Sequence, residues 1–434
     1  MEFSRWKNLF VVLAMTAVFT TGISFALQNK TYFFNQEAAV SALPKNVVAA
    51  SIQLPAVPPP PQKLSNPPEI IKSIYVTGYS AGEKSYLNYL RLLFKNTEIN
   101  AVVVDIKGSD GYVTYSSAAG DVAKYKLTDY AIGDIDALVK FFHDQNIYVI
   151  GRIAAFEDPV YAKARPELAV YNKAKTTDLS NPVLWQDNNG LSWLDPASKD
   201  VWNYDISLAK DAFYNGFDEV NFDYSRFPTD GKMGNMGFPV YDGKISMADT
   251  IKDFFHYVRT SLPNEKISVD LFGLTTVDTD DMGIGQVIED AFENFDYVCP
   301  MVYPSHFAGG FISFANPAAH PYEVIDYSMA QAEAKENIFS KQRQDLAIKH
   351  SEAVGTPAAL LQVLTPAPVF VPLSKFRPWL QDFNMGAEYT SDMVKQEIKA
   401  TQDSLGNNFV GFMLWNPENI YTQDAVAKET VANN

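Results

Sequence analysis

Residues that build many common active sites are scarce in this chain. Its 434 residues include one cysteine, Cys299, so no intramolecular disulfide can form. The 5 histidines are scattered, without an HExxH motif or a Cys/His pair at zinc spacing. Residues 278–289 follow the spacing of a calcium loop, but Met282 stands where an oxygen ligand is needed. We therefore expect neither a metal site nor a bound cofactor.

Positive charge is also scarce, with 35 Lys and Arg against 51 Asp and Glu and a net charge of −16. Because such a chain repels phosphate backbones, we expect no nucleic-acid partner. Hydrophobic residues make up 47% of the chain and aromatic residues 13%. This composition is typical of a globular protein with a large core, and aromatic rings also suit a cleft that binds sugars.

The N-terminal part of the chain predicts export. Arg5 and Lys7 precede residues 9–27, an uncharged and mostly apolar run that resembles a secretory signal. Ser24-Phe25-Ala26 supplies a cleavage pattern, but the run is also long enough to span a membrane. We expect residues 1–27 to be a signal peptide or a membrane anchor. The rest of the chain is then extracytoplasmic, either secreted or anchored to the membrane by residues 9–27.

A proline-rich linker is expected at residues 28–71. The prolines include Pro55, Pro67, Pro68 and the run from Pro58 to Pro61, which a helix or a central strand does not tolerate. Such a spacer holds a folded domain away from a surface.

Strand-like and helix-like segments alternate from residue 72 to residue 423. Predicted strands lie at residues 74–76, 101–105, 147–153, within 216–228, at 267–272, 297–303 and 409–415, and at 376–382 or alternatively 358–364. Predicted helices lie at residues 86–94, 135–142, 199–215, 247–261, 323–351 and 391–405. Eight strands alternating with helices predict an α/β fold, a (β/α)8 TIM barrel over residues 72–423 with a C-terminal tail at residues 424–434.

The stretch GFDEVNFDYSRFP at residues 216–228 carries the clearest functional pattern. Phe222 and Tyr224 alternate with polar residues, among them Asp223, so we expect an apolar face that packs outward and a polar face opposite. The strand ends before a proline, which places Asp223 near its C-terminal end, where TIM barrels carry catalytic carboxylates. The structural alternatives for this carboxylate are a helix cap or an ion pair with Arg226.

Other predicted strands also end in groups that suit chemistry on sugars. Carboxylates follow at Asp105, Asp270 and Asp382, each with a structural ion pair as the alternative. Alternation places Lys107 on the same face as Asp105. Hydrogen-bonding and stacking groups for a substrate are Lys107, Arg152, Trp193, Arg226, Tyr303, His306, Trp379, Trp415 and Asn416.

This set of residues is typical of glycoside hydrolysis, in which one carboxyl group protonates the leaving oxygen and a second attacks or activates water. Asp223 is the preferred nucleophile or base. Asp270, on the next strand, is the preferred acid, with Asp105 and Asp382 in reserve. The expected partner is a polysaccharide or oligosaccharide outside the cell or in the cell wall.

Several stretches follow one another in a familiar order, including KSIYVTGYSAG, NAVVVDIKGSDG, GFDEVNFDYSRFP, DYVCPMVYPSHF and GFMLWN. Together they resemble a bacterial family named "putative glycosyl hydrolase domain" over about residues 72–421. The resemblance implies a (β/α)8 barrel and glycosidase-like activity. The fourth strand is also similar to the D-x-x-D-x-D-x-E pattern of chitinase-type barrels. Ser225 stands there in place of the Glu that is their proton donor, which argues against chitinase chemistry.

Two other functions stay open at this stage. Because Ser225 replaces that Glu, the alternative is a catalytically silent barrel that binds glycans at the cell envelope. Residues 78–82, GYSAG, match the G-x-S-x-G nucleophile motif, which favours a serine esterase that uses Ser80. An α/β-hydrolase has several strands before its nucleophile, however, and here one strand precedes it.

Overall fold

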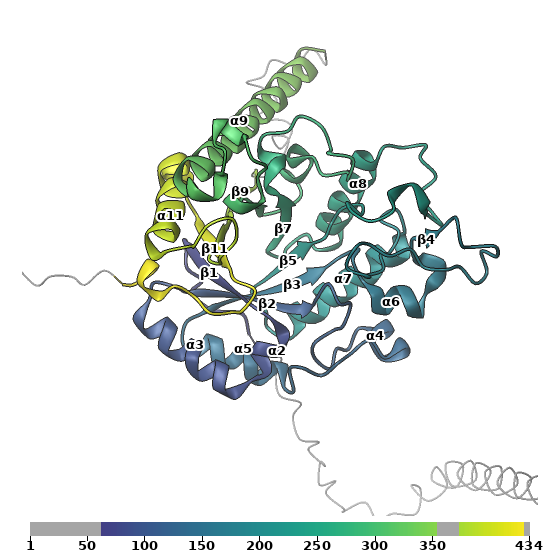
Figure 1. The fold of residues 1–434 in the computed structure, drawn as a ribbon, viewed down its shortest axis with the longest axis horizontal. Coiled ribbons are helices and arrows are strands. Elements are labelled where there is room, and N and C mark those ends of the chain that lie inside the picture. The colour runs from purple at the N-terminus through teal and green to yellow at the C-terminus, as the bar shows by residue number, and fades with distance from the viewer. Residues whose placement is uncertain (1–61, 354–372, 429–434) are drawn as a thin grey trace, which may run out of the picture. The chain divides into compact units, whose positions relative to one another are not determined.

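The computed structural model describes residues 62–353 and 373–428. Within these ranges, eight parallel strands close into a barrel (Figure 1): β1 (Ile71–Val76), β2 (Ala101–Lys107), β3 (Tyr148–Ala154), β5 (Glu219–Asp223), β7 (Ile267–Phe272), β8 (Tyr297–Met301), β10 (Trp379–Gln381) and β11 (Gly411–Trp415). Neighbours follow that order around the ring, and pairing of β10 with both β8 and β11 closes it. The two-residue strand β9 (Lys375–Phe376) adds to β8 just before β10 begins. The predicted (β/α)8 TIM barrel is confirmed.

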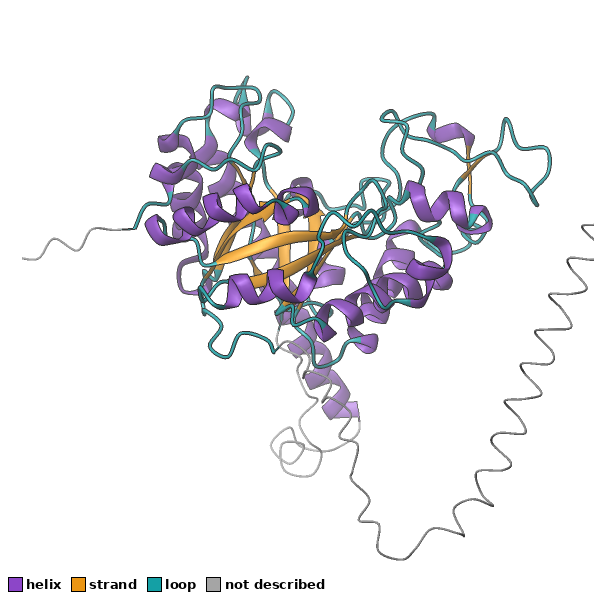
Figure 2. Ribbon diagram, turned by 90° about the horizontal axis from the view of Figure 1, so that it is seen from below, coloured by secondary structure: helices purple, strands orange, loops and turns teal. Residues whose placement is uncertain are grey.

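Helices cover the outside of the barrel (Figure 2). The described helices are α2 (Gly78–Gly82), α3 (Lys84–Asn96), α4 (Gly120–Tyr125), α5 (Ile135–His143), α6 (Pro159–Ala164), α7 (Lys199–Tyr214), α8 (Met247–Ser261), α9 (Pro321–Ala353) and α11 (Ser391–Leu405). Side-chain caps explain several starts, because Asp134, Ser246 and Thr390 each accept a hydrogen bond from the first turn that follows. The bounds of α8 and α11 are the predicted ones.

Side chains alternate along the barrel strands, so that one set packs outside the barrel and the other packs inside it. On β5, Phe222 faces outward, and its ring lies 6.4 Å from those of Phe254 and Phe295. The polar residues of the same strand face the barrel interior, where Glu219 forms a fully buried ion pair with Arg377. An apolar outer face and a polar inner face on β5 agree with the sequence-based expectation.

Two long connections build a lobe beside the barrel. One runs from β3 to α7 and the other from β5 to α8, and they pair through the short antiparallel strands β4 (Tyr171–Asn172) and β6 (Met236–Gly237). Figure 1 places β4 away from the barrel axis. Because both connections leave the C-terminal ends of barrel strands, the lobe raises the wall on that side of the rim.

Some sequence-based expectations lie outside the described residues, namely the apolar run at 9–27, the linker up to residue 61 and the alternative strand at 358–364. The competing strand at residues 376–382 is present as β9 and β10. No helix in residues 62–353 or 373–428 combines the length and apolarity needed to cross a membrane.

Candidate active site

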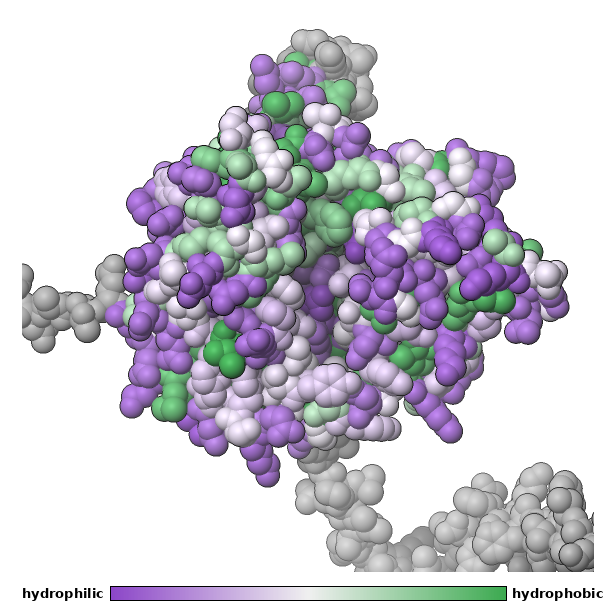
Figure 3. Space-filling model, viewed as in Figure 1, coloured by the Kyte–Doolittle hydropathy of each residue, from purple (hydrophilic) through white to green (hydrophobic). Residues whose placement is uncertain are grey.

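The C-terminal ends of the barrel strands surround a cavity of about 420 Å³. In Figure 3 the face of the molecule is hollowed near its centre, with hydrophobic residues gathered along one side of the hollow. Eight of the residues expected from the sequence line the cavity: Arg152, Asp223, Arg226, Asp270, Tyr303, His306, Trp379 and Trp415. They come from β3, β5, β7, β8, β10 and β11 or from the loops that follow, so the closed barrel is what brings them together.

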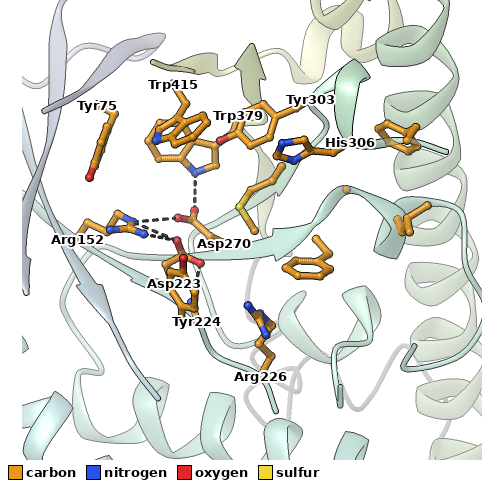
Figure 4. A pocket seen from close by; sticks show the side chains of 15 residues that line it. Tyr75, Arg152, Asp223, Tyr224, Arg226, Asp270, Tyr303, His306, Trp379 and Trp415 are labelled. Atoms are coloured by element: carbon orange, nitrogen blue, oxygen red, sulfur yellow. Dashed lines mark hydrogen bonds and ion pairs between the residues drawn. The ribbon is translucent and has the colours of Figure 1, made fainter. Parts of the chain in front are cut away.

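Arg152 on β3 lies at the centre of the charged groups (Figure 4). Its Nε and Nη2 donate to Oδ2 of Asp223 at 3.1 and 2.5 Å, and its Nη1 donates to Oδ1 of Asp105 at 2.6 Å. Tyr75 on β1 donates from its hydroxyl to the other oxygen of Asp105. Burial raises the pKa of Asp105, and the Arg152 guanidinium opposes that rise. Asp105 therefore holds Arg152 in place rather than facing the cavity itself.

Asp270 on β7 lies in a different environment from Asp223. Its side chain is 1% exposed, and its Oδ1 accepts hydrogen bonds from Asn221 at 2.9 Å and from the indole of Trp379 at 2.7 Å. Burial, and then the nearby charge of Asp223, raise the pKa of Asp270 well above its usual range. A raised pKa favours the protonated form of this carboxyl group, which suits a general acid.

The two carboxyl groups face a common guanidinium. Oδ2 of Asp223 lies 3.1 Å from Nε of Arg152, and Oδ2 of Asp270 lies 4.0 Å from the same nitrogen. A carboxylate held by Arg152, beside a buried carboxyl group with a raised pKa, is a pair of environments that suits the separate roles of base and acid.

Tyr224 departs from the outward-facing position that alternation along the strand predicts. It directly follows β5 and has a φ of 51°, in the left-handed region that non-glycine residues rarely adopt. Its backbone N–H donates to Oδ1 of Asp223 at 2.6 Å, and its side chain lines the cavity. The reversed backbone therefore turns the ring inward and helps to hold the carboxylate. Strain of this kind is concentrated at functional sites.

Aromatic rings form much of the cavity wall. The rings of Tyr303 and Trp415 lie 5.5 Å apart, and Tyr75 meets Trp379 edge to face at 6.4 Å. Trp379 is 2% exposed and Tyr303 5%, whereas Tyr75 and Trp415 are half-buried. His306 is exposed and packs on Tyr303 with a ring separation of 5.1 Å. Half-buried rings beside carboxylates are typical of sites that stack on sugars.

Lys107 does not line the cavity, contrary to the sequence-based expectation. The register between β2 and β3 shifts between Asp105 and Lys107, so the two side chains do not share a face. Nζ of Lys107 is fully buried and donates to Asp158 at 3.0 Å and to Asp205 at 3.1 Å. This lysine ties β2 to α6 and α7.

Asp382 and Asn416 also lie outside the cavity lining. The carboxylate of Asp382 accepts hydrogen bonds from the N–H and the hydroxyl of Thr422, at 2.8 and 2.5 Å. Asn416 donates to backbone oxygens of Asp382 and Ile420. Both residues therefore fasten the segment after β11 to the barrel, and this contact between distant parts of the chain left no local signal in the sequence.

Trp193 lies behind the cavity wall rather than on it. It is 1% exposed, and its indole N–H donates to Asp187 at 3.1 Å. The guanidinium of Arg226 stacks on its ring, with 4.7 Å between the Cζ atom and the ring centroid. Trp193 thus supports a residue that does line the cavity.

The structure gives Ser80 a helical position. Residues 78–82 form the short helix α2, which Thr77 caps, and the hydroxyl of Ser80 accepts a hydrogen bond from that of Thr77 at 2.9 Å. A nucleophile elbow would instead present the serine on a sharp turn between strand and helix.

In residues 278–289, the stretch with the spacing of a calcium loop, two of the acidic side chains have partners within the protein. Asp280 accepts a hydrogen bond from the N–H of Met282, and Glu289 pairs with Lys335 at 3.7 Å.

Sequence reasoning missed several residues of the cavity wall, namely Tyr75, Tyr224, Phe272, Gly273, Leu274, Met301 and Phe307. All follow or end barrel strands, so their position at the C-terminal rim was the available signal. Their apolar character made them indistinguishable from core residues in the sequence.

One solved structure supports the barrel fold, and two others are similar at lower TM-scores. The glycoside hydrolase domain of PgaB (BpsB) from Bordetella bronchiseptica is similar with a TM-score of 0.51 and 12% identity, over 83% of this chain and 100% of that one. A hypothetical protein from Ruminiclostridium thermocellum is 38% identical over 48% of this chain and 98% of that chain, with a TM-score of 0.41. TtGalA, an α-galactosidase from Thermus thermophilus, is 12% identical over 83% of this chain and 61% of that one, with a TM-score of 0.43.

No curated protein matches the chain. A family of protein domains does, and the match covers residues 73–347 and 365–421, which include every strand of the barrel except the first two residues of β1. The predicted resemblance is therefore confirmed, and the chain belongs to the family described as "Putative glycosyl hydrolase domain".

Proposed function

We propose that the protein is a glycoside hydrolase that cleaves an extracellular or cell-wall polysaccharide with Asp223 and Asp270. One observation carries this proposal: carboxyl groups at the ends of the adjacent strands β5 and β7 line one cavity in opposite environments. Asp223 is paired with Arg152, whereas burial raises the pKa of Asp270. Glycosidases use one carboxyl group as the acid and a second as the nucleophile or base.

The chemistry divides between these two residues. Asp270 gives its proton to the glycosidic oxygen as the bond to the anomeric carbon breaks, so the leaving sugar departs as a neutral alcohol. Asp223 either attacks the anomeric carbon or removes a proton from the water that attacks it. Arg152 orients the carboxylate of Asp223 through two hydrogen bonds, and Asp105, which accepts a hydrogen bond from Tyr75, holds Arg152 in place. Rings on the cavity wall supply stacking surfaces for the sugar.

The proposal is tested by incubating the purified protein with cell-wall and plant polysaccharides and with aryl glycosides. Release of reducing ends by the wild type, lost in Asp223→Asn, supports it. Equal cleavage by the wild type and Asp223→Asn would reject the site. The anomeric form of the first product, read by NMR, then separates attack by Asp223 from attack by water.

A catalytically silent glycan-binding barrel is the second candidate. Both oxygens of Asp223 are already engaged, one by Arg152 and the other by the N–H of Tyr224, as in a purely structural network. The same screen separates the two candidates, since a silent barrel binds a glycan of the panel and cleaves none.

We further propose that the barrel acts outside the cytoplasm. The basic residues before the apolar run at 9–27 and the prolines that follow support this location. A periplasmic reporter fused after residue 70 is expected to be active. A reporter that stays in the cytoplasm as a soluble protein counts against export.

A further inference from the structure

Arg226 is a second guanidinium on the cavity wall, separate from the network around Arg152. Figure 4 shows it on the side of Tyr224 away from Arg152, without a dashed line to either carboxylate. It is 7% exposed, yet it is one of the residues that line the cavity. A buried charge normally has a partner of opposite sign, so an unpaired one calls for a function.

The donors of Arg226 are only partly used. Nη1 donates to the carbonyl oxygen of Phe227 at 3.1 Å and to Oγ1 of Thr229 at 3.3 Å. Nε and Nη2 donate to no residue in the described ranges, and no described carboxylate lies within 4.0 Å. By contrast, Arg152 and Arg377 are both paired with carboxylates. The Nε–Nη2 edge of Arg226 therefore presents two parallel N–H donors without a protein acceptor.

Aromatic rings surround this guanidinium and hold it in place. Its Cζ atom lies 4.7 Å from the ring centroid of Trp193, 4.8 Å from that of Phe272 and 5.2 Å from that of Tyr224. Each ring lies within the range of a cation–π contact, so the charge is stabilised without being neutralised. A guanidinium immobilised in this way loses little conformational freedom when it binds an anion.

Glu157, a buried carboxyl group whose charge would act on Arg226, is mostly uncharged at neutral pH. Glu157 is 4% exposed, and burial raises its pKa to about 8, although the charge of Arg226 opposes the rise. At pH 7 most Glu157 side chains are therefore protonated. Asp223, whose charge also acts on Arg226, is already paired with Arg152, so no carboxylate in the described residues forms an ion pair with Arg226.

We propose that Arg226 binds a carboxylate of the substrate, and that the substrate is an acidic glycan containing uronic acid. This inference rests on the proposed function and adds a substrate class to it. Two parallel donors match the two oxygens of one carboxylate in a bidentate pair. A single unpaired cation beside Asp223 balances one negative charge, which fits a carboxylate better than a dianionic phosphate. Tyr224 and Phe272, the two of these rings that line the cavity, then contact the sugar that carries the carboxylate.

The test measures binding of free monosaccharides, so it does not depend on hydrolysis. D-Glucuronate and D-galacturonate are titrated at pH 7 against D-glucose and D-galactose, by calorimetry on the full-length protein. The wild type is expected to bind a uronate at least about tenfold more tightly than its neutral counterpart, the usual effect of a charge-assisted hydrogen-bonded pair. Equal affinities, or no uronate binding up to 50 mM, overturn the inference.

Two variants locate the effect. Arg226→Gln is expected to abolish the preference for uronates, whereas Glu157→Gln, which removes a carboxyl group that is already neutral, is expected to retain it. Persistence of the preference in Arg226→Gln overturns the inference, provided that its thermal unfolding shows a folded protein. Arg226→Met, which keeps the packed alkyl chain, serves if the Gln variant does not fold. Uronate binding without cleavage of any glycan would reject the proposed hydrolase and leave the carboxylate site standing.

Discussion

The indole nitrogen of Trp379 donates a 2.7 Å hydrogen bond to Oδ1 of Asp270. Asn221 donates to the same oxygen at 2.9 Å, whereas the nearest cationic nitrogen to Oδ2 is Nε of Arg152, at 4.0 Å. One oxygen is therefore held by neutral donors and the other is available to carry the proton. Both donors favour the charged form, so they limit the rise in pKa that burial causes.

Trp379→Phe is expected to move the pH profile of the enzyme. The variant keeps an aromatic ring but removes the hydrogen bond that lowers the pKa of Asp270, so this pKa rises further. If Asp270 is the acid, the alkaline limb of the kcat/KM profile moves up by about 0.5–1 pH unit, the value of one hydrogen bond. The profile is measured on a glycan that the wild type cleaves. An unmoved alkaline limb would show that another group supplies the proton.

Asp223→Asn is expected to lower kcat by at least about 1,000-fold while glycan binding is retained, because the amide neither attacks carbon nor accepts a proton. Asp270→Asn is expected to slow substrates with poor leaving groups most, since these need protonation as the bond breaks. Turnover is measured on a polysaccharide and on an activated aryl glycoside. Equal losses on both substrates in Asp270→Asn would contradict its role as acid.

Local patterns in the sequence predicted the barrel and the positions of Asp223 and Asp270 on its inner face. Parallel barrel strands are buried on both faces, so segments such as residues 101–104 read as continuous apolar runs. The alternation of side chains along β5 predicted that Asp223 lies on the inner face of the barrel. Because β7 is the next strand of the barrel, Asp270 was expected beside Asp223. Both predictions require only that side chains alternate along a strand and that the parallel strands close into a barrel.

The remaining features depend on exceptions to regular geometry or on distant contacts. The left-handed backbone of Tyr224 turns a ring inward that alternation points outward. The irregular register after Asp105 removes Lys107 from the inner face. Thr422 meets Asp382 only once the chain has folded. No local sequence pattern encodes such a break in periodicity or such a pairing.

Lys107→Met is expected to affect folding rather than substrate binding. The substitution leaves Asp158 and Asp205 buried without their cation, which costs about 3–5 kcal/mol of stability. Because Lys107 does not line the cavity, KM is expected to be unchanged in whatever fraction stays folded. Urea unfolding and KM on a cleaved glycan measure the two effects. A stable variant with a raised KM would restore the substrate role that the sequence suggested.

Glu157→Gln is expected to stabilise the protein at alkaline pH. Burial raises the pKa of Glu157 from 4.5 to about 8, so the folded state holds a proton that the unfolded state releases. The stability contributed by this group is complete below about pH 4.5 and is lost as the pH rises through about 8. Glutamine has nearly the same shape and never ionises, so the variant escapes this loss.

The free energy of unfolding of the wild type and of Glu157→Gln is compared by urea titration at pH 5 and pH 8.5. The two are expected to be nearly equal at pH 5, and the variant to be more stable by on the order of 2–4 kcal/mol at pH 8.5. Glu418→Gln, at an exposed position, is the matched control and is expected to show no difference that depends on pH. A stability gap for Glu157→Gln that stays constant between the two pH values would mean that Glu157 is already ionised at neutral pH. Arg226 would then have a counter-charge within the protein, and a substrate carboxylate would no longer be needed to balance it.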